Sequence, residues 1–220
     1  MRHMRAVSAR RFWAVWTAGL AVWAIGLIMI APHDLTIAQA VYNPQSIPAR
    51  AVALAGEWPL WIVFLGSLSA LAFHARLFPN RPRYRDVATL IVLQAIVHPF
   101  LITQALKRLW GRVRFRDLSP GLLDYTHFYE PAGPGAGQSF PSGHVAMSLI
   151  LAPLVFYVFA SQKRAAALAL LGAVSAYGLF VSYCRMVTGA HYPTDVAFSF
   201  GCSFLVAALI VRYVPTGLER

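Results

Sequence analysis

The chain has 220 residues, of which 58% are hydrophobic and 12% are charged. Average soluble proteins carry about 25% charged residues, so these few charges cannot cover the surface of a water-soluble globule of this size. The high hydrophobic content also excludes intrinsic disorder, which requires low hydrophobicity. The remaining class is a membrane protein, and we expect a single membrane-embedded domain over residues 1–220.

The charge is strongly positive, with 19 Lys and Arg against 8 Asp and Glu. Such an excess is compatible with nucleic acid, anionic lipid, a phosphorylated substrate, or cytoplasmic loops that are rich in Lys and Arg. The two cysteines, Cys184 and Cys202, are too few for a disulfide framework or a zinc site. We therefore expect both cysteines to be small core residues.

Six segments are apolar enough to cross a bilayer, which takes about 20 residues each. They are Phe12–Ala31, Trp58–Leu77, Val87–Leu106, Val145–Ser161, Ala165–Tyr183 and Thr194–Val214. Their periodicity is helical and is bounded by Arg, Pro and Gly, without the alternating ten-residue segments of a membrane β-barrel. The sequence therefore predicts an all-α polytopic membrane protein built as a bundle of six transmembrane helices.

The first of these segments also has features of a secretory signal, since Met1–Arg11 is basic and Ala38-Gln39-Ala40 resembles a cleavage site. A cleavable signal has an apolar core of about 7–15 residues, whereas this core has about 20. We expect a retained anchor.

The loops on the two sides of the membrane differ in charge. With the N-terminus inside, the cytoplasmic segments contain twelve basic and two acidic residues, and the outside segments contain seven basic and six acidic residues. Because cytoplasmic loops are enriched in Lys and Arg, both termini are predicted to be cytoplasmic. Five of the seven outside cations fall within Lys107–Arg116, on the side where cations are otherwise scarce.

These clustered cations can be arranged in two ways. Lys107 and Arg114 are seven residues apart, nearly two helical turns, and share a face if the helix continues. If Gly111 ends the helix and the chain becomes extended, Arg112, Arg114 and Arg116 share a face instead. Either arrangement gathers donors suited to phosphate. The alternative is a patch of side chains that reach anionic lipid headgroups.

A second outside segment, Pro141-Ser142-Gly143-His144, stands directly before the fourth apolar segment. A Pro-Ser-Gly sequence entering a helix aims backbone amides and the positive end of the helix dipole at one point, which favours an anion. His144 can carry a proton to or from a bound oxyanion there. The alternative is an ordinary helix start with an interfacial histidine.

The third outside segment joins the fifth and sixth apolar segments. Pro193 suits the first turn of the sixth helix, which brings Asp195 within reach of His191. A carboxylate in this arrangement fixes the tautomer of an imidazole and raises its basicity, and Arg185 adds a donor for phosphate. The alternative is that Asp195 favours the helix N-terminus. The three segments together supply cations, a proton donor and a nucleophile at one membrane face.

This combination resembles the signature of the type 2 phosphatidic acid phosphatase family, which also includes bacterial acid phosphatases and vanadium haloperoxidases. The matching segments are 107–114, 141–144 and 185–195. Two flanking residues depart from the family pattern: Phe115 replaces a proline, and Cys184 stands where serine is usual. These departures affect the fine positioning of the neighbouring charged residues more than the chemistry.

The resemblance implies a role for each matching residue. His191 would attack phosphorus to give a phosphohistidine, with Asp195 orienting and supporting it. His144 would protonate the leaving group and then activate water. The residues that would hold the phosphate oxygens are Lys107, Arg114, Ser142, Gly143 and Arg185. No metal and no cofactor are expected.

The implied activity is hydrolysis of the phosphate monoester or diphosphate of a membrane lipid, of the phosphatidic acid, phosphatidylglycerol phosphate, undecaprenyl diphosphate or lipid A class. Two alternatives are a phosphotransferase that passes the group to another lipid and a non-catalytic carrier of anionic lipids. A carrier has no use for the pair of His191 and Asp195. The expected partners are the bilayer and a lipid phosphate, without nucleic acid. The expected location is a bacterial inner membrane, with the site facing the periplasm or the cell exterior.

Two regions are candidates for substrate selection. His33–Glu57 is long enough for an interfacial helix, and Asp117–Gln138 could form a lid over the headgroup or simply an aromatic belt at the membrane interface. Arg108, Arg112 and Arg116 are surplus to the family motif. We expect Arg112 and Arg116 in particular to contact an additional anionic group on the substrate headgroup.

Overall fold

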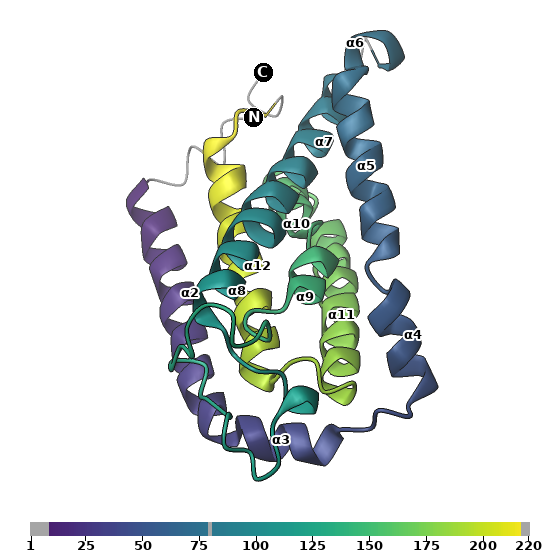
Figure 1. Cartoon of the computed structure of the whole chain (residues 1–220). Coiled ribbons are helices and arrows are strands. Elements are labelled where there is room, and N and C mark those ends of the chain that lie inside the picture. The colour runs from purple at the N-terminus through teal and green to yellow at the C-terminus, as the bar shows by residue number, and fades with distance from the viewer. Residues whose placement is uncertain (1–8, 79–80, 217–220) are drawn as a thin grey trace.

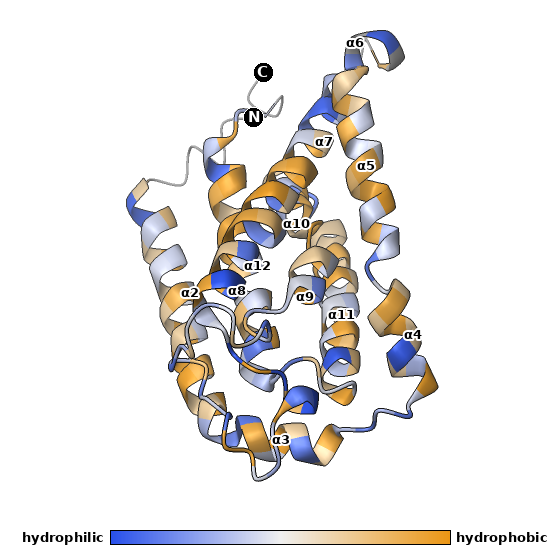
Figure 2. Ribbon diagram, in the orientation of Figure 1, coloured by the Kyte–Doolittle hydropathy of each residue, from blue (hydrophilic) through white to orange (hydrophobic). Residues whose placement is uncertain are grey.

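The computed structural model describes residues 9–78 and 81–216, without the side chains of Ala75 and Leu77. Within these residues the secondary structure is helical, with no β-strand. Six helical stretches of this part of the chain are long and apolar enough to cross a membrane, which confirms the predicted fold class. Hydrophobic residues cover the long helices, whereas the segments that join them are more hydrophilic (Figure 2).

The six long helical stretches of the described residues run alternately in opposite directions through the bundle, and α3 (Asp34–Val41) lies across one of its ends (Figure 1). In chain order the helices of this part of the chain are α2 (Ala9–Ile30), η1 (Ala31–His33), α3 (Asp34–Val41), α4 (Ile47–Ala55), α5 (Trp58–Ala72), α6 (His74–Leu77), α7 (Pro82–Ala95), the π-helix η2 (Ile96–Ile102), α8 (Thr103–Trp110), η3 (Phe115–Asp117), α9 (Gly143–Ser148), α10 (Ala152–Ala160), α11 (Arg164–Val187) and α12 (Pro193–Tyr213).

Three of the six predicted spans are not single regular helices. The third consists of α7, η2 and α8, and the π-helical turn contains Pro99, which has no amide proton to donate within the helix. The fourth is divided into α9 and α10, and Pro153 stands in the first turn of α10. The second is divided at Phe73 into α5 and α6, and the apolar helical stretch begins with α4 at Ile47, well before the predicted Trp58.

The ends of the first and last helices lie at the same end of the bundle. The start of α2 and the end of α12 lie at the same end of the bundle as α6 (Figure 1). The opposite end holds α3, which contacts α11 and α12, and the long loop that follows α8. The cytoplasmic location of the termini stays a prediction. Part of the charge asymmetry on which it depends comes from residues 1–8 and 217–220, which lie outside the described residues.

The first helix packs against the last. The indole nitrogens of Trp16 and Trp23 donate hydrogen bonds to the carbonyl oxygens of Leu205 and Ala197, both at 3.1 Å. Gly201 lies directly beneath the Trp23 ring, where a β-carbon would come within 2.2 Å of it. Small residues of this kind allow close approach of helices in a membrane, where packing and hydrogen bonds drive association.

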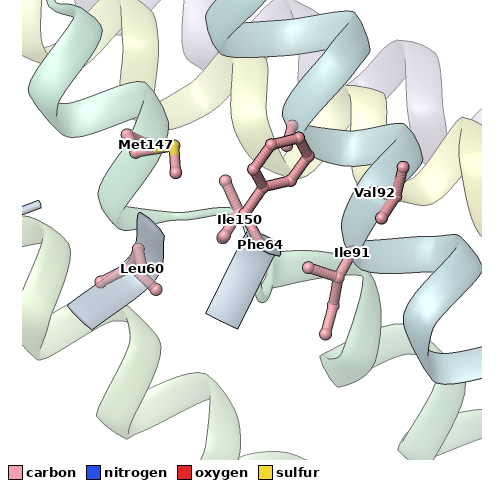
Figure 3. Close-up of a cluster of buried hydrophobic side chains, with 7 residues drawn as sticks. Leu60, Phe64, Ile91, Val92, Met147 and Ile150 are labelled. Carbon is pink, nitrogen blue, oxygen red and sulfur yellow. The ribbon is translucent and has the colours of Figure 1, made fainter. Parts of the chain in front are cut away.

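A buried cluster holds α9 in the middle of the bundle (Figure 3). It joins α5, α7 and α9 with the turn after α9 through Leu60, Phe64, Ile91, Val92, Ala95, Met147 and Ile150. A second cluster links α7, α10 and α12, and includes Leu90, Tyr157 and Cys202. Because α9 is fixed on several sides, the residues at its start are held in a defined place.

Both cysteines are buried and unpaired, which confirms that they are core residues. Cys184 packs against Ala49 of α4 and Val187 at the end of α11. Cys202 belongs to the cluster between α7, α10 and α12.

Candidate active site

The three predicted segments meet at one place in the structure. The amide of Ser142 donates to the carbonyl oxygen of Asp195 at 3.3 Å, which joins the start of α9 to the start of α12. The Lys107 ammonium donates to the carbonyl oxygen of Gln138 at 3.2 Å. A β-carbon on Gly143 would lie 3.8 Å from Cε of Lys107, so α8 reaches the same point.

Gly111 ends α8 and separates the cations of the first segment. Its φ of 70° is in the left-handed region, and a β-carbon would lie 1.7 Å from the carbonyl oxygen of Gly133. Beyond it the chain is extended at Arg114, with φ −73° and ψ 149°. The helix stops at this glycine, as in the second arrangement that the sequence allows, but the three arginines do not form one face, because Arg112 is fully buried and Arg116 is partly exposed.

Arg112 turns into the protein and joins two carboxylates. One terminal nitrogen donates to Asp195 at 2.7 Å and to the Thr194 hydroxyl at 3.0 Å, and the other donates to Asp34 at 2.9 Å. All three charged side chains are fully buried. The structure corrects the expectation that Arg112 contacts a substrate headgroup, because the side chain has no exposed surface and each terminal nitrogen already donates to a buried partner. A buried cation is tolerated here because it is paired and hydrogen bonded.

Arg116 lies at the edge of the site. Its Nε is 3.5 Å from a carboxylate oxygen of Asp117, and 37% of its side chain is exposed. Such an exposed pair contributes little to stability, so the Arg116 side chain is available to another anion. Its predicted contact with a headgroup stays a prediction.

Arg114 and Arg185 differ from Arg112 in having unsatisfied donors. The Nε of each is buried without a hydrogen-bond partner among the described residues. One terminal nitrogen of Arg185 donates to the Ala53 carbonyl oxygen at 3.4 Å. Both arginines lie close enough to Lys107 to repel it electrostatically. Because an unmatched buried donor costs free energy, this group of cations favours the binding of an anion.

His191 is held by a backbone carbonyl rather than by a carboxylate. Its Nδ1 is 2.6 Å from the carbonyl oxygen of Ser139 and 3.7 Å from Asp195, which is beyond hydrogen-bond range. The hydroxyl of Ser139 donates to the same Asp195 carboxylate at 2.5 Å. Ser139 therefore stands between Asp195 and His191, a link that the sequence motif does not reveal.

The surroundings of His191 keep its imidazole neutral. Burial lowers its pKa from the ordinary 6.5 to about 3 and outweighs the nearby Asp195 carboxylate, which raises it, while the positive charges of Arg185 and Lys107 lower it further. Since a carbonyl oxygen can only accept, the proton of the neutral ring lies on Nδ1. The lone pair is then on Nε2, as a nucleophile requires.

Asp195 also caps its own helix. Its carboxylate accepts a hydrogen bond from the amide of Tyr192 at 2.9 Å, and α12 begins at Pro193, as predicted. Asp195 therefore fits both interpretations: it lies near His191, and it caps the N-terminus of α12.

His144 has a carboxylate partner that the sequence motif does not include. Its Nε2 is 3.0 Å from Oε1 of Glu57 and 3.1 Å from the carbonyl oxygen of Ala53. The imidazole is 25% exposed, so unlike His191 it is open to the surroundings. The sequence holds one hint of Glu57 as the partner of His144 and of Asp34 as the partner of Arg112. These two are the only acidic residues among the first 85 residues.

The two departures from the family signature have local packing partners. The Phe115 ring makes an edge-to-face contact with Tyr42, with ring centroids 5.1 Å apart. Tyr42 follows α3, so this contact ties the first segment to the N-terminal part of the chain. Cys184 faces α4.

The loop after η3 folds back on the site. The indole of Trp110 donates to the Phe128 carbonyl oxygen at 2.6 Å, and Nε of Arg112 donates to that of Thr126 at 3.0 Å. The Tyr125 ring lies 5.6 Å from the ring of Tyr192, the neighbour of His191. The loop therefore covers one side of the site, and its action as a lid stays a prediction.

The site thus combines a neutral imidazole, unmatched cationic donors and a second, partly exposed imidazole beside a carboxylate. This set fits a tetrahedral anion that is attacked by one histidine and protonated by the other. Among the described residues, no cluster of three or more His, Cys, Asp and Glu side chains is placed to hold a metal ion.

Comparison with known proteins assigns the chain to a family. Residues 86–218, more than half of the chain, match the family model of the PAP2 superfamily. The chain therefore belongs to the PAP2 superfamily, which confirms the resemblance to type 2 phosphatidic acid phosphatases.

One curated relative is the lipid A 1-phosphatase of Rhizobium etli, which is 33% identical over 129 residues. The alignment covers 56% of this chain and 49% of that protein, so the chain spans about half the length of this relative. The comparison with solved structures found no match.

Proposed function

We propose that the protein is a membrane-embedded phosphatase that removes a phosphate group from a lipid, with His191 as the nucleophile. The observation that carries this proposal is the pair of unmatched buried donors on Arg114 and Arg185 close to a neutral, buried imidazole. Membership of the PAP2 superfamily and the similarity to a lipid A 1-phosphatase support it.

In the first step, Nε2 of His191 attacks phosphorus, and a P–N bond forms as the bond to the lipid oxygen breaks. His144 gives its proton to the departing oxygen, so the lipid leaves as a neutral alcohol or, from a diphosphate, as a protonated phosphate. Lys107, Arg114 and Arg185 hold the non-bridging oxygens while charge moves between them. The Ser142 hydroxyl and the Gly143 amide donate further hydrogen bonds to these oxygens.

In the second step, His144 accepts a proton from a water molecule that attacks the phosphohistidine. The P–N bond breaks, inorganic phosphate forms, and the electron pair returns to Nε2 of His191. Asp195 supports the positive charge of His191 during the reaction. It does so across 3.7 Å and through its hydrogen bond to Ser139.

A lipid substrate follows from where these residues lie. The cationic group lies at the end of a bundle whose long helices are apolar, so a phosphate at the membrane surface can reach it while the lipid chains stay in the bilayer. Given the charge asymmetry of the loops, this end faces the periplasm or the cell exterior of a bacterial inner membrane.

The test is phosphate release by the purified protein from lipid monophosphates and diphosphates in detergent. We expect release by the wild type and a loss on the order of 10⁴-fold or more in His191→Ala. His74→Ala, at the opposite end of the bundle, is the matched control and should keep full activity. Activity that persists in His191→Ala would contradict the mechanism. If the phosphate of the substrate is labelled, transfer of the label to an acceptor lipid without release of phosphate would identify a phosphotransferase.

A further inference from the structure

Two carboxylates at the site come from outside the part of the chain that matches the family model. Asp34 begins α3 and Glu57 stands between α4 and α5, whereas the match covers residues 86–218. They are the only acidic residues in the first 85, and each contacts a different part of the site.

Glu57 contacts the proton carrier. Its Oε1 lies 3.0 Å from Nε2 of His144, and the Ala53 carbonyl oxygen shares that nitrogen at 3.1 Å. Two acceptors on Nε2 fix the direction of the ring and place a proton on that nitrogen. Nδ1 is then the nitrogen left to exchange a proton with a leaving group or with water.

Asp34 is connected to the nucleophile instead. Its carboxylate accepts from Arg112 at 2.9 Å, from the Thr194 amide at 2.8 Å and from the Thr194 hydroxyl. Arg112 in turn donates to Asp195 at 2.7 Å. From there the chain of contacts continues through Ser139 to His191, and its charged members are fully buried.

We propose that Asp34 and Glu57 are positioning residues that serve different histidines of the same reaction. Glu57 holds His144 in place for proton transfer to the leaving group. Asp34 holds the ion pair of Arg112 and Asp195 in place beside His191. The N-terminal segment from Asp34 to Glu57 is thus part of the catalytic apparatus. This assignment rests on the proposed phosphatase function.

The test compares two substrates that carry the same phosphate but differ in leaving group, an alkyl phosphate lipid and an aryl phosphate. A poor alkyl leaving group needs protonation, whereas an aryl oxide leaves without it. In Glu57→Gln we expect the rate of the first step, measured as the initial burst of leaving-group release, to fall about 10-fold or more for the alkyl substrate, while this rate stays within about 3-fold for the aryl substrate. In Asp34→Asn we expect the rate of the first step to fall by similar factors for both substrates, with KM little changed.

His144→Gln and His191→Ala are the reference variants, and thermal unfolding checks that every variant is folded. His144→Gln should show the same leaving-group dependence of the first step as Glu57→Gln, and His191→Ala should release the leaving group from neither substrate. Glu57 is 23% exposed at its side chain, so this variant keeps the test informative even if Asp34→Asn does not fold.

The outcomes separate the two levels of the proposal. Persistent activity in His191→Ala overturns the phosphatase mechanism itself. With His191→Ala inactive, equal losses on both substrates in Glu57→Gln, or no loss at all, overturn only the role of Glu57. A loss in folded Asp34→Asn that is restricted to the alkyl substrate overturns the link between Asp34 and His191.

Discussion

Arg112 and Arg114 are two residues apart in one basic segment, yet their surroundings are opposite. Arg112 is enclosed by two carboxylates, a hydroxyl and a carbonyl oxygen. Arg114, like Arg185 on α11, has a buried Nε with no partner among the described residues. Pairing, more than position in a motif, therefore separates an arginine that holds the structure from one that is available to a substrate.

The largest effect is expected from Arg112→Gln. This change leaves the buried carboxylates of Asp34 and Asp195 without their shared cation, which should lower the free energy of unfolding by about 3–5 kcal/mol. Unfolding of the purified protein in detergent, followed by circular dichroism, measures it. Arg114→Gln is the matched control, and equal losses of stability in both variants would erase the distinction between the two arginines.

Arg114→Gln should act on catalysis instead. Removal of one preorganised donor to the transition state lowers kcat by about 10²–10³-fold, while the unfolding transition should stay where it is in the wild type. Steady-state phosphate release measures this loss. Unchanged kinetics in a folded Arg114→Gln protein would mean that the unmatched guanidinium does not contact the phosphate.

Gly111→Ala tests the turn that separates the two arginines. A β-carbon would collide with the Gly133 carbonyl oxygen in a backbone conformation that is strained for alanine, so a loss of about 1–3 kcal/mol is expected. Gly66→Ala is the control, because a β-carbon at this position in α5 meets no neighbour within 4 Å. Similar stabilities for the two variants would show that the turn does not need glycine.

The smallest expected change concerns the proton on His191. Because its pKa is lowered to about 3, the imidazole should stay neutral from pH 8 down to pH 5, with its proton on Nδ1. Its contribution to stability is complete above about pH 6.5 and declines as the pH falls toward 3, since only the unfolded chain takes up the proton there. Nitrogen NMR of selectively labelled protein measures the pKa and the tautomer of His191. A midpoint near 6.5 would contradict the buried, cation-flanked site, and Arg185→Gln should raise the pKa slightly.

The helices were predictable from sequence because the bilayer sets their length and polarity. The breaks within the helices were less predictable. Pro99 and Pro153 are visible in the sequence, but whether a proline bends, bulges or divides a helix depends on its neighbours in space. The signature segments were predictable because their order and spacing are specific. The structure brings Lys107, Ser142 and Asp195 together through backbone and side-chain contacts.

The connections between the site residues were not predictable. Arg112 looked like a spare cation because its partner Asp34 lies 78 residues away in the sequence, and no local pattern joins the two. The same holds for Glu57 and His144. Asp195 was expected to hold His191 directly, yet a carbonyl oxygen from Ser139 takes that place, since backbone groups leave no mark in a sequence motif.

The most direct test of the account is to trap the covalent intermediate. The protein is incubated briefly with lipid substrate labelled in its phosphate and quenched in alkali, in which phosphohistidine survives, and the labelled peptide is identified by mass spectrometry. We predict label on Nε2 of His191, with none in His191→Ala, and slower loss of label in His144→Gln because water is no longer activated. Label on another residue, or rapid turnover with no labelled histidine at any time, would contradict it.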